Sequence, residues 1–373
     1  MTGPRKLHAT DTPLFAAANI NGLALSNRVV VAPMTRISAS TEGHATEAMV
    51  RYYARFARGG FGLVVTEGTY TDQAYSQGYA NQPGLSDVSQ ARAWRPVTSA
   101  IQAAGGRVIA QLMHAGALSQ SNRFRNHTAG PAAIRPKGRQ MALYRGQGEY
   151  RMPHAMTEVD IVQAIAGFSR AALLAMEVAG FDGVEIHGAN GYLLDQFLTD
   201  YTNTRSDAWG GTIDHRIRMV TEVVRAVRDV VGSTVPVGVR ISQGKVNDSL
   251  HKWPEAEQGA ATLFTALAGS AVDYIHVTEL EAWRPAFADV GPTLIELART
   301  HAPDARVIAN GSLHDPVRAI AALADGADFV ALGRGALSNP DWPQRLKDGR
   351  ALTPFVSALL SPLGDIKATE QAG

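Results

Sequence analysis

Three side chains that could act on one substrate stand close together after a short apolar run at residues 183–187. They are His187, Asn190 and Tyr192. Alternation along the run puts Glu185 and His187 on one face of a strand and the apolar residues on the other. A histidine and an asparagine can both donate hydrogen bonds to one oxygen, and a phenol can donate a proton. The spacing therefore favours chemistry on a polarised carbonyl compound.

An enone is a substrate on which these three side chains could cooperate. If His187 and Asn190 hydrogen-bond to its carbonyl oxygen, the β-carbon becomes electron-poor. The same bonds stabilise the negative charge that develops on the oxygen when a hydride arrives. Tyr192 could then protonate the neighbouring carbon. The alternative is a polar strand end in which His187 only satisfies backbone groups, and spacing alone leaves both interpretations open.

Two glycine-containing pairs, Asn310-Gly311 and Gly333-Arg334, end later apolar runs and suggest a phosphate site. Glycine lets the backbone approach a ligand closely, and arginine can bind phosphate through two hydrogen bonds. The alternative is a pair of ordinary turns with an exposed arginine. No glycine-rich dinucleotide fingerprint follows an early apolar run, so a bound phosphate-bearing cofactor fits better than a Rossmann nicotinamide site.

Further polar residues follow other apolar runs, and the fold must bring them together if they form one site. They are Thr35, Gln111, His114 and Arg240. The carboxyl ends of parallel barrel strands meet on one face, where such enzymes build their active sites. We therefore expect these side chains to converge with those at 187–192, 310–311 and 333–334.

The order of apolar runs and amphipathic stretches predicts an α/β protein with a (β/α)₈ TIM barrel. Strand-like runs occur at 29–33, 62–66, 107–111, 183–187, 235–241, 274–277, 306–309 and 329–332. Helical stretches occur at 47–58, 89–104, 158–179, 213–231, 255–268, 292–301, 316–324 and 341–347, and Thr157 is the expected N-cap of the third. Before the first run, Asn21-Gly22 predicts a β-hairpin.

A long excursion, residues 117–155, follows the third strand and interrupts the alternation of strands and helices. Because it leaves the active-site face of the barrel, it is either a lid or substrate loop, or a surface excursion without catalytic contacts. The polar tail at 361–373 is expected to be frayed or used in subunit contact. We expect residues 1–373 to form a single domain.

Composition narrows the class of protein. The 373 residues are 45% hydrophobic and 18% charged, with 35 basic and 34 acidic side chains and no cysteine. Disulfides, thiolate metal sites, cysteine-held iron–sulfur clusters and a cysteine nucleophile are thereby excluded. A net charge of +1 argues against a general positive surface for binding nucleic acid.

The apolar runs are of strand length, and residues 1–11 are polar, so we expect no membrane span and no signal peptide. A soluble cytoplasmic monomer or homo-oligomer is expected.

Several longer motifs carry a family resemblance. The run 27–36, NRVVVAPMTR, is followed by Thr66-Glu67-Gly68, by Gln111 to His114, and by the segment 183–198 with its HGANGY core. The blocks 203–211 (NTRSDAWGG) and 339–341, together with Arg216, complete the set. From about residue 13 to 347, this sequence resembles the old yellow enzyme family.

This resemblance implies an FMN-dependent ene-reductase that is reduced by NADPH or NADH and then reduces an activated alkene. It assigns the isoalloxazine and ribityl contacts to Ala32, Pro33, Thr35, Gly68 and Gln111, and the pyrimidine side of the flavin to Arg240. The phosphate contacts would be Asn310, Gly311, Gly333 and Arg334. His187 and Asn190 would anchor the activating carbonyl or nitro group, and Tyr192 would be the proton donor.

The sequence also departs from the family pattern. Thr35 occupies a position that is Cys in one branch, Met113 one that is often Trp, and Ala117 one that is often Arg. The tail lacks the family's aromatic pattern. Two other functions stay open on the same residues: a flavin-binding protein without turnover, and a metal-dependent aldolase or hydrolase using Glu185, His187 and His276. No tight ligand spacing supports a metal, so none is expected.

Overall fold

The computed structural model describes residues 12–371, and in it eight parallel strands close into a barrel, as the eight apolar runs predict. The strands are β3 (Val29–Val31), β4 (Leu63–Val65), β6 (Arg107–Met113), β9 (Gly183–Asn190), β10 (Val237–Lys245), β11 (Tyr274–Thr278), β12 (Arg306–Asn310) and β13 (Phe329–Leu332). Pairing of β4 with β6 closes the ring, and a short β5 (Thr69–Tyr70) extends the β6 edge. The polar stretch expected at 1–11 lies outside the described residues.

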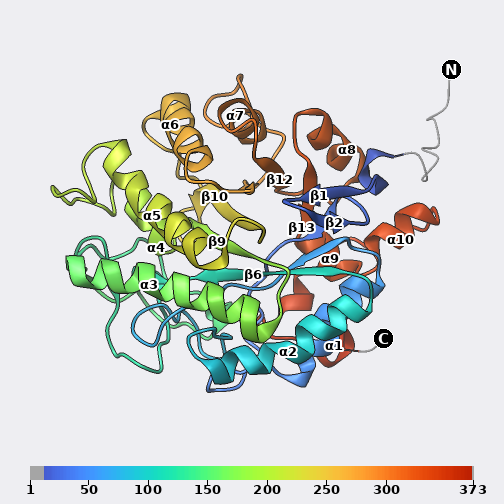
Figure 1. Cartoon of the computed structure of the whole chain (residues 1–373), viewed down its shortest axis with the longest axis horizontal. Helices are drawn as coiled ribbons and strands as arrows, with labels where there is room; N and C mark the ends of the chain where they lie inside the picture. The colour runs from blue at the N-terminus through green and yellow to red at the C-terminus, as the bar shows by residue number, and fades with distance from the viewer. Residues whose placement is uncertain (1–11, 372–373) are drawn as a thin grey trace.

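Helices surround the strands (Figure 1). They are α1 (Glu47–Arg58), α2 (Val88–Ala103), α3 (Glu158–Leu174), α5 (Ile213–Val231), α6 (Ala256–Ala268), α7 (Leu294–His301), α8 (Pro316–Ala324) and α10 (Trp342–Lys347). Two short helices, α4 (Leu193–Leu198) and α9 (Arg334–Ser338), lie at strand ends that the sequence pattern assigned to loops. Single turns of helix are η1 (Pro13–Phe15), η2 (Gly116–Leu118), η3 (Ala142–Tyr144), η4 (Ala175–Ala179), η5 (Ser357–Leu360) and η6 (Ala368–Glu370).

Alternation along the strands separates two apolar layers. In β4, Val64 packs outward into the large core under the helices, whereas Leu63 and Val65 join the cluster that fills the barrel interior. Successive side chains of a strand point to opposite faces, so one short β-branched run supplies both layers. The expected split along β9 is confirmed, because Val184 and Ile186 belong to the outer core.

A hairpin plugs the amino-terminal end of the barrel. Strands β1 (Ala18–Ile20) and β2 (Leu23–Leu25) pair antiparallel around Asn21 and Gly22, both with positive φ, as the sequence predicts. Ile20 and Leu25 are buried in the cluster that fills the barrel interior. The interior at this end is therefore solid apolar core.

The longest apolar stretch is a helix on the outside of the barrel. Thr157 caps α3 through a capping box with Asp160, as expected. With its π-helical end, the stretch Glu158–Ala179 is long and apolar enough to cross a membrane, with a mean hydropathy of 1.4. Polar residues interrupt this stretch, so it meets the criteria for a span by length and mean composition and not as one apolar run. The helix packs against α5, which is the position of an outer barrel helix.

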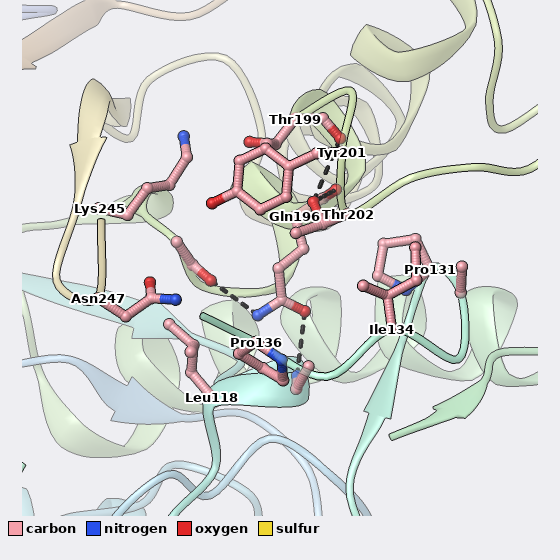
Figure 2. Close-up of a pocket in the computed structure, with 13 residues that line it drawn as sticks. Leu118, Pro131, Ile134, Pro136, Gln196, Thr199, Tyr201, Thr202, Lys245 and Asn247 are labelled. Atoms are coloured by element: carbon pink, nitrogen blue, oxygen red, sulfur yellow. Dashed lines mark hydrogen bonds between the residues drawn. The ribbon is translucent and has the colours of Figure 1, made fainter. Parts of the chain in front are cut away.

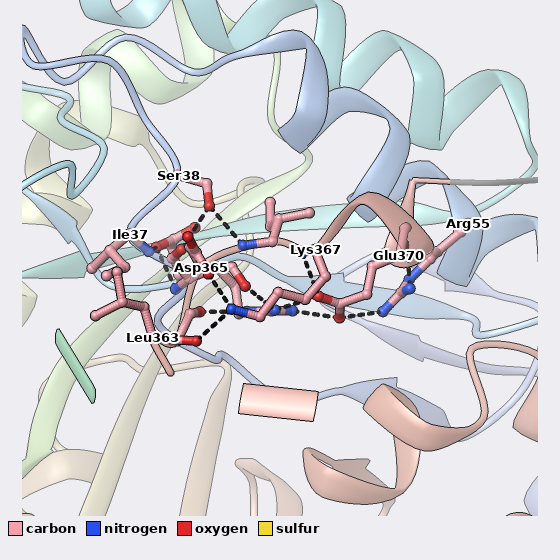
Figure 3. Close-up of polar contacts among 11 residues, drawn as sticks. Ile37, Ser38, Arg55, Leu363, Asp365, Lys367 and Glu370 are labelled. Atoms are coloured by element: carbon pink, nitrogen blue, oxygen red, sulfur yellow. Dashed lines mark hydrogen bonds and ion pairs between the residues drawn. The ribbon is translucent and has the colours of Figure 1, made fainter. Parts of the chain in front are cut away.

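The carboxyl-terminal tail is docked, which corrects the expectation of a frayed end for the described residues up to 371. Ser38 accepts a hydrogen bond from Ile366 N at 2.8 Å, and Leu143 O accepts one from Gly364 N at 2.8 Å. The Glu370 carboxylate accepts hydrogen bonds from the guanidinium groups of Arg36 and Arg55. Figure 3 shows Glu370 beside Arg55. The tail thus joins the loop after β3, helix α1 and the long excursion.

Candidate active site

One open cavity of about 940 Å³ lies at the carboxyl end of the barrel strands. Most of the predicted site residues line it, although they come from the ends of six different strands. These are Pro33, Thr35, Gly68, Gln111, His187, Asn190, Tyr192, Arg240, Gly333 and Arg334. The convergence expected from the parallel barrel is thus what the structure shows for these ten residues.

The end of β9 presents two hydrogen-bonding side chains that the protein leaves free. The His187 Nδ1 faces Ala189 N at 3.4 Å, so Nδ1 accepts and the proton is placed on Nε2. Burial, together with the nearby Arg240 charge, holds the pKa of His187 well below its usual value, so the ring is neutral at pH 7. Within residues 12–371, neither His187 Nε2 nor the Asn190 amide has a protein partner. Both can donate to a ligand oxygen.

The backbone at this strand end is strained in a way that turns the chain sharply. Asn190 and Gly191 have φ values of 61° and 85°. Asn190 N donates to Ser242 Oγ at 2.8 Å, and Gly191 N donates to Asp195 Oδ2 at 2.6 Å. These bonds hold a left-handed turn that a non-glycine residue seldom adopts. The turn brings Asn190 and Tyr192 to the same cavity.

Tyr192 is buried and hydrogen-bonded to a second phenol. Its hydroxyl lies 2.6 Å from that of Tyr79, and its ring packs edge-on against His187 with the centroids 4.9 Å apart. Burial raises the pKa of Tyr192, while the bond from Tyr79 opposes that rise. Burial raises the pKa of Tyr79 as well. Tyr192 therefore keeps its proton at neutral pH, as a general acid must.

A fully buried polar layer lies beneath the cavity. Glu185 accepts hydrogen bonds from Gln111 Nε2 and His276 Nδ1, each at 2.8 Å. Burial alone would raise the pKa of Glu185, but His276 and Arg240 bring it below its usual value. Burial lowers the pKa of His276, so a neutral ring donates to a carboxylate. The bond to Glu185 orients the Gln111 amide, which leaves its oxygen as an acceptor for a ligand in the cavity.

Arg240 places a positive charge on the cavity wall. Its Nη2 donates to Asn310 Oδ1 at 2.8 Å and to Thr278 Oγ1 at 3.2 Å. Burial lowers its pKa to about 10, so the guanidinium remains charged at neutral pH. Its Nε is buried without a hydrogen-bond partner. A buried donor of this kind calls for an acceptor from a ligand.

An adjoining cavity of about 1050 Å³ contains the predicted phosphate residues Asn310, Gly311, Gly333 and Arg334. Gly311 has φ 144°, and a Cβ there would lie 2.4 Å from Glu279 O, so only glycine fits. The Asn310 side-chain oxygen accepts from Arg240 and Thr278, and its Nδ2 donates to the Ala331 carbonyl, so the protein itself holds this side chain.

The loop after β3 is held from below by a buried carboxylate. Glu67 Oε2 accepts hydrogen bonds from the backbone N–H groups of Arg36 and Ile37, at 2.8 and 3.2 Å. Tyr53 donates to its other oxygen at 3.2 Å. Burial raises the pKa of Glu67 to about 7. Because Thr35 precedes Arg36, these bonds position the Thr35 side chain on the cavity wall.

A second pocket lies behind the Asn190–Gly191 turn (Figure 2). Its polar centre is Gln196, whose amide donates to Gly191 O at 2.7 Å and accepts from Ala117 N at 3.0 Å. Beside it, Lys245 Nζ forms a buried ion pair with Asp195 Oδ1 at 2.7 Å. These hydrogen bonds and this ion pair stabilise the Asn190–Gly191 turn. Ala117 lines this second pocket and not the active-site cavity.

Two predicted residues lie elsewhere. His114 does not reach the cavity, because it is buried with its Nε2 3.5 Å from Asp72 Oδ2, so its expected convergence is wrong. Ala32 lines neither cavity, and its N–H donates to Leu332 O at 3.0 Å, which joins the ends of β3 and β13. Met113 does line the cavity, and a Cβ on Gly68 would lie 2.4 Å from its sulfur.

Sequence reasoning offered the excursion at 117–155 as a lid or substrate loop but did not identify the residues that form one wall of the cavity. That wall consists of Met141, Leu143 and Tyr144 from the excursion and Leu360 from the segment before the tail. Tyr79, the partner of Tyr192, was missed too, because it lies in the irregular stretch between β5 and α2. No spacing rule identifies these residues. The aromatic and apolar types within an otherwise polar excursion were the only signal available.

Comparison with known proteins agrees with this geometry. Residues 13–353 match the model of the NADH:flavin oxidoreductase / NADH oxidase family. The chain is 35% identical to chanoclavine-I aldehyde reductase fgaOx3 of Penicillium roqueforti, over 92% of this chain and 91% of that protein. It is 33% identical to a probable flavin mononucleotide-dependent alkene reductase of Leishmania infantum, covering 89% and 90%.

A solved structure shows the same fold. The old yellow enzyme homologue from Zymomonas mobilis superposes with a TM-score of 0.85 at 30% identity, covering 96% of this chain and 98% of that one. The match to the family model and the two curated relatives extend over most of the barrel. The chain therefore belongs to the NADH:flavin oxidoreductase family, the old yellow enzymes, and is a flavin oxidoreductase.

Proposed function

We propose that this protein reduces the activated C=C bonds of enones, enals and nitroalkenes, with FMN as its bound cofactor and NADPH or NADH as the reductant. The observation that carries the proposal is the end of β9. There a neutral His187 and the Asn190 amide, both free of protein partners, share one cavity with the buried phenol of Tyr192. A likeness to proteins named as aldehyde and alkene reductases supports it.

The residues present fit a flavin mononucleotide. The orphaned Arg240 Nε and the oriented Gln111 amide offer a donor and an acceptor to a polar ring edge. The Gly311 backbone and the exposed Arg334 guanidinium offer contacts to a phosphate. We assign Pro33, Thr35 and Gly68 to the flavin ring on the same grounds. A cation at Arg240 would favour the reduced, anionic form of the ring.

The chain's own groups then act on the substrate. When bound, reduced FMN supplies the hydride. His187 Nε2–H and the Asn190 amide hydrogen-bond to the activating oxygen and stabilise the charge that gathers there. Tyr192 gives its proton to the carbon next to the activating group, and Tyr79 hydrogen-bonds to the oxygen that loses it.

Two other functions find less support. The set Glu185, His187 and His276 forms no metal site, because Glu185 is bonded to His276 and Gln111, and no group of metal ligands occurs within residues 12–371. A flavin-binding protein without turnover would leave the free donors at β9 unexplained. Family membership points the same way, since the family is one of oxidoreductases.

An anaerobic spectral titration tests the proposal. We expect the purified protein to carry FMN, to lose its yellow absorbance on addition of NADPH or NADH, and to regain it with cyclohexenone. Absence of flavin would refute the cofactor assignment. Bleaching that no activated alkene reverses would leave only an oxidase or binding role. We also place the protein in the cytoplasm, which cell fractionation can check.

Tyr192→Phe separates the two half-reactions. Loss of the proton donor should slow reoxidation by the alkene by about 10²-fold or more, because a positioned general acid contributes that much. Reduction of the flavin by the nicotinamide should change little. Stopped-flow absorbance measures each half-reaction, and an equal loss in both would contradict the proton-donor role.

A further inference from the structure

A basic hollow in the long excursion has no role in the site described above. It measures about 1020 Å³, is open to solvent, and is lined by the segment 119–128 and by Arg151. Its lining includes three arginines and one histidine: Arg123, Arg125, His127 and Arg151. None of its lining residues is acidic. All four side chains are exposed.

Within residues 12–371, none of the three arginines of the hollow forms an ion pair. Arg123 lies close enough to the Glu42 carboxylate to help lower the pKa of that group. Arg151 Nη1 donates to the backbone oxygen of Asn126, and the Arg123 guanidinium lies 5.3 Å from the Phe124 ring. Two other cations of the excursion are paired, Arg135 with Glu149 and Lys137 with Asp248. Several unpaired cations around one concavity attract an anion.

The hollow adjoins the active-site cavity. Gln120 lines the hollow, and its Oε1 accepts a hydrogen bond from Met141 N at 2.6 Å while its Nε2 donates to Met141 O at 3.3 Å. Met141 lines the active-site cavity. Gln120 N and Ser121 N both donate to Gly78 O, next to Tyr79. A residue that lines the hollow is thus hydrogen-bonded to a residue that lines the cavity.

We infer that this hollow binds a phosphate group of the nicotinamide dinucleotide while its nicotinamide ring lies in the cavity. The inference rests on the proposed function, in which the dinucleotide reduces a flavin bound in the cavity. A dinucleotide carries its phosphates away from its reacting ring. Arg123, Arg125 and Arg151 offer planar donors that suit phosphate oxygens. Two groups have this chemistry: the pyrophosphate, common to NADH and NADPH, and the 2′-phosphate, present only in NADPH.

The test uses the FMN-loaded protein and the double variant Arg123→Gln/Arg125→Gln. Its matched control replaces Arg170, an exposed arginine of the outer helix α3 that lacks an ion pair within the described residues, by Gln. Calorimetric titration with 2′,5′-ADP and with 5′-AMP measures binding without turnover. Stopped-flow reduction by NADPH and by NADH gives the apparent Kd of each dinucleotide.

We expect the double variant to weaken binding about tenfold or more, since hydrogen bonds to a charged group contribute on this scale. Weakening confined to NADPH and 2′,5′-ADP supports the inference and assigns the 2′-phosphate. Equal weakening for NADH and NADPH supports it and assigns the pyrophosphate. Unchanged constants for all four ligands, as in Arg170→Gln, would overturn it. Reoxidation by cyclohexenone should be unaffected.

The two proposals fail differently. If the wild-type protein were not reduced by either dinucleotide, the proposed function would fail. The calorimetric titrations would still decide whether the hollow binds phosphate. If the wild type reduces alkenes normally and the double variant binds every ligand as tightly as the wild type, only this inference fails.

Discussion

Among single residues, Tyr79 has the clearest influence on the chemistry of another side chain. Two buried phenols 2.6 Å apart share one hydrogen bond, and either oxygen can donate. When Tyr192 gives up its proton, its oxygen becomes the acceptor and the Tyr79 hydroxyl must be the donor. A hydrogen bond to a charged oxygen is roughly twice as strong as one between neutral groups. Tyr79 should therefore be a positioning residue for proton transfer.

Tyr79→Phe should slow alkene reduction without abolishing it. The Tyr192 phenol would remain, but its pKa would rise because the bond that opposes the effect of burial is lost. We expect roughly a tenfold slower oxidative half-reaction, the scale of one hydrogen bond to a charged group. Tyr150→Phe, a control in the same apolar cluster, should leave the rate of this half-reaction unchanged.

The raised pKa of Glu67 predicts how the free energy of unfolding changes with pH. Its folded pKa of about 7 lies above the ordinary value of 4.5, so the folded state holds this proton more tightly than the unfolded state does. The stabilisation of the folded state by the protonated Glu67 carboxyl is fully present below pH 4.5 and is lost as the pH rises to 7. The loss is on the order of 3 kcal/mol.

Denaturant unfolding of Glu67→Gln checks this sign. The glutamine cannot titrate, so the unfolding free energy of the wild type should fall relative to that of the variant between pH 4.5 and 7. The exposed Glu149, paired with Arg135, provides the control in Glu149→Gln. A difference between wild type and Glu67→Gln that stays constant across this range would show that Glu67 has an ordinary pKa.

At the scale of elements, the tail and the loop after β3 act as one unit. Arg36 is buried, and its guanidinium donates to Gly364 O, Asp365 O and both oxygens of Glu370. The same tail contacts the excursion through Leu143, which lines the cavity. Removing the carboxylate would leave a buried cation without its partner, which is costly.

Glu370→Ala should therefore destabilise the protein by about 3–5 kcal/mol, the range for breaking a buried pair from one side. It should also weaken FMN binding, because Arg36 follows Thr35 on the cavity wall. Glu47→Ala removes an exposed partner of Arg51 on α1 and should cost less than about 1 kcal/mol. Thermal unfolding and fluorescence titration with FMN measure the two effects. Equal effects of the two substitutions would argue against a docked tail.

For the whole molecule, buried neutral histidines predict acid sensitivity. Burial lowers the pKa values of His114, His187 and His276 below the ordinary 6.5. Above pH 6.5 such a histidine is neutral in both the folded and the unfolded state. As the pH falls below 6.5, only the unfolded state takes up the proton, so the free energy of unfolding decreases. Each can reduce the unfolding free energy by about 1.4 kcal/mol per pH unit.

Urea unfolding of the FMN-loaded protein at pH 7, 6 and 5 measures this effect. We expect the urea concentration at the midpoint to fall steadily as the pH decreases from 6.5. Glu67 has the opposite effect, since it adds stability at lower pH, but this effect is smaller. Because the rings are buried, added salt should not remove the effect. A midpoint unchanged between pH 7 and 5 would contradict it.

The fold was largely predictable because it depends on patterns that are local in the chain. β-branched runs of period two, helical stretches and the Asn21-Gly22 turn specify the barrel and its plug. Residues at strand ends were predictable for the same reason, since a parallel barrel gathers them. His187, Asn190 and Arg240 are examples.

What the sequence did not reveal depends on contacts between distant residues. Arg36 and Glu370 are 334 positions apart, and nothing near either one indicates the other. Tyr79 and Tyr192 are 113 positions apart, and Tyr79 lies in an irregular segment. His114 shows the converse error: it ends a strand as expected, but the turn there directs its ring towards Asp72. Loop conformation follows from tertiary packing, which local propensity does not determine.

The apolar plug formed by β1 and β2 has a kinetic consequence. Because Ile20, Leu25 and the interior cluster close one end of the barrel, ligands must come and go through the other end. On the proposed function, electron donor and electron acceptor use the same cavity, so we expect the first to leave before the second binds. Steady-state velocities plotted as double reciprocals should give parallel lines, and an excess of either reactant should inhibit turnover.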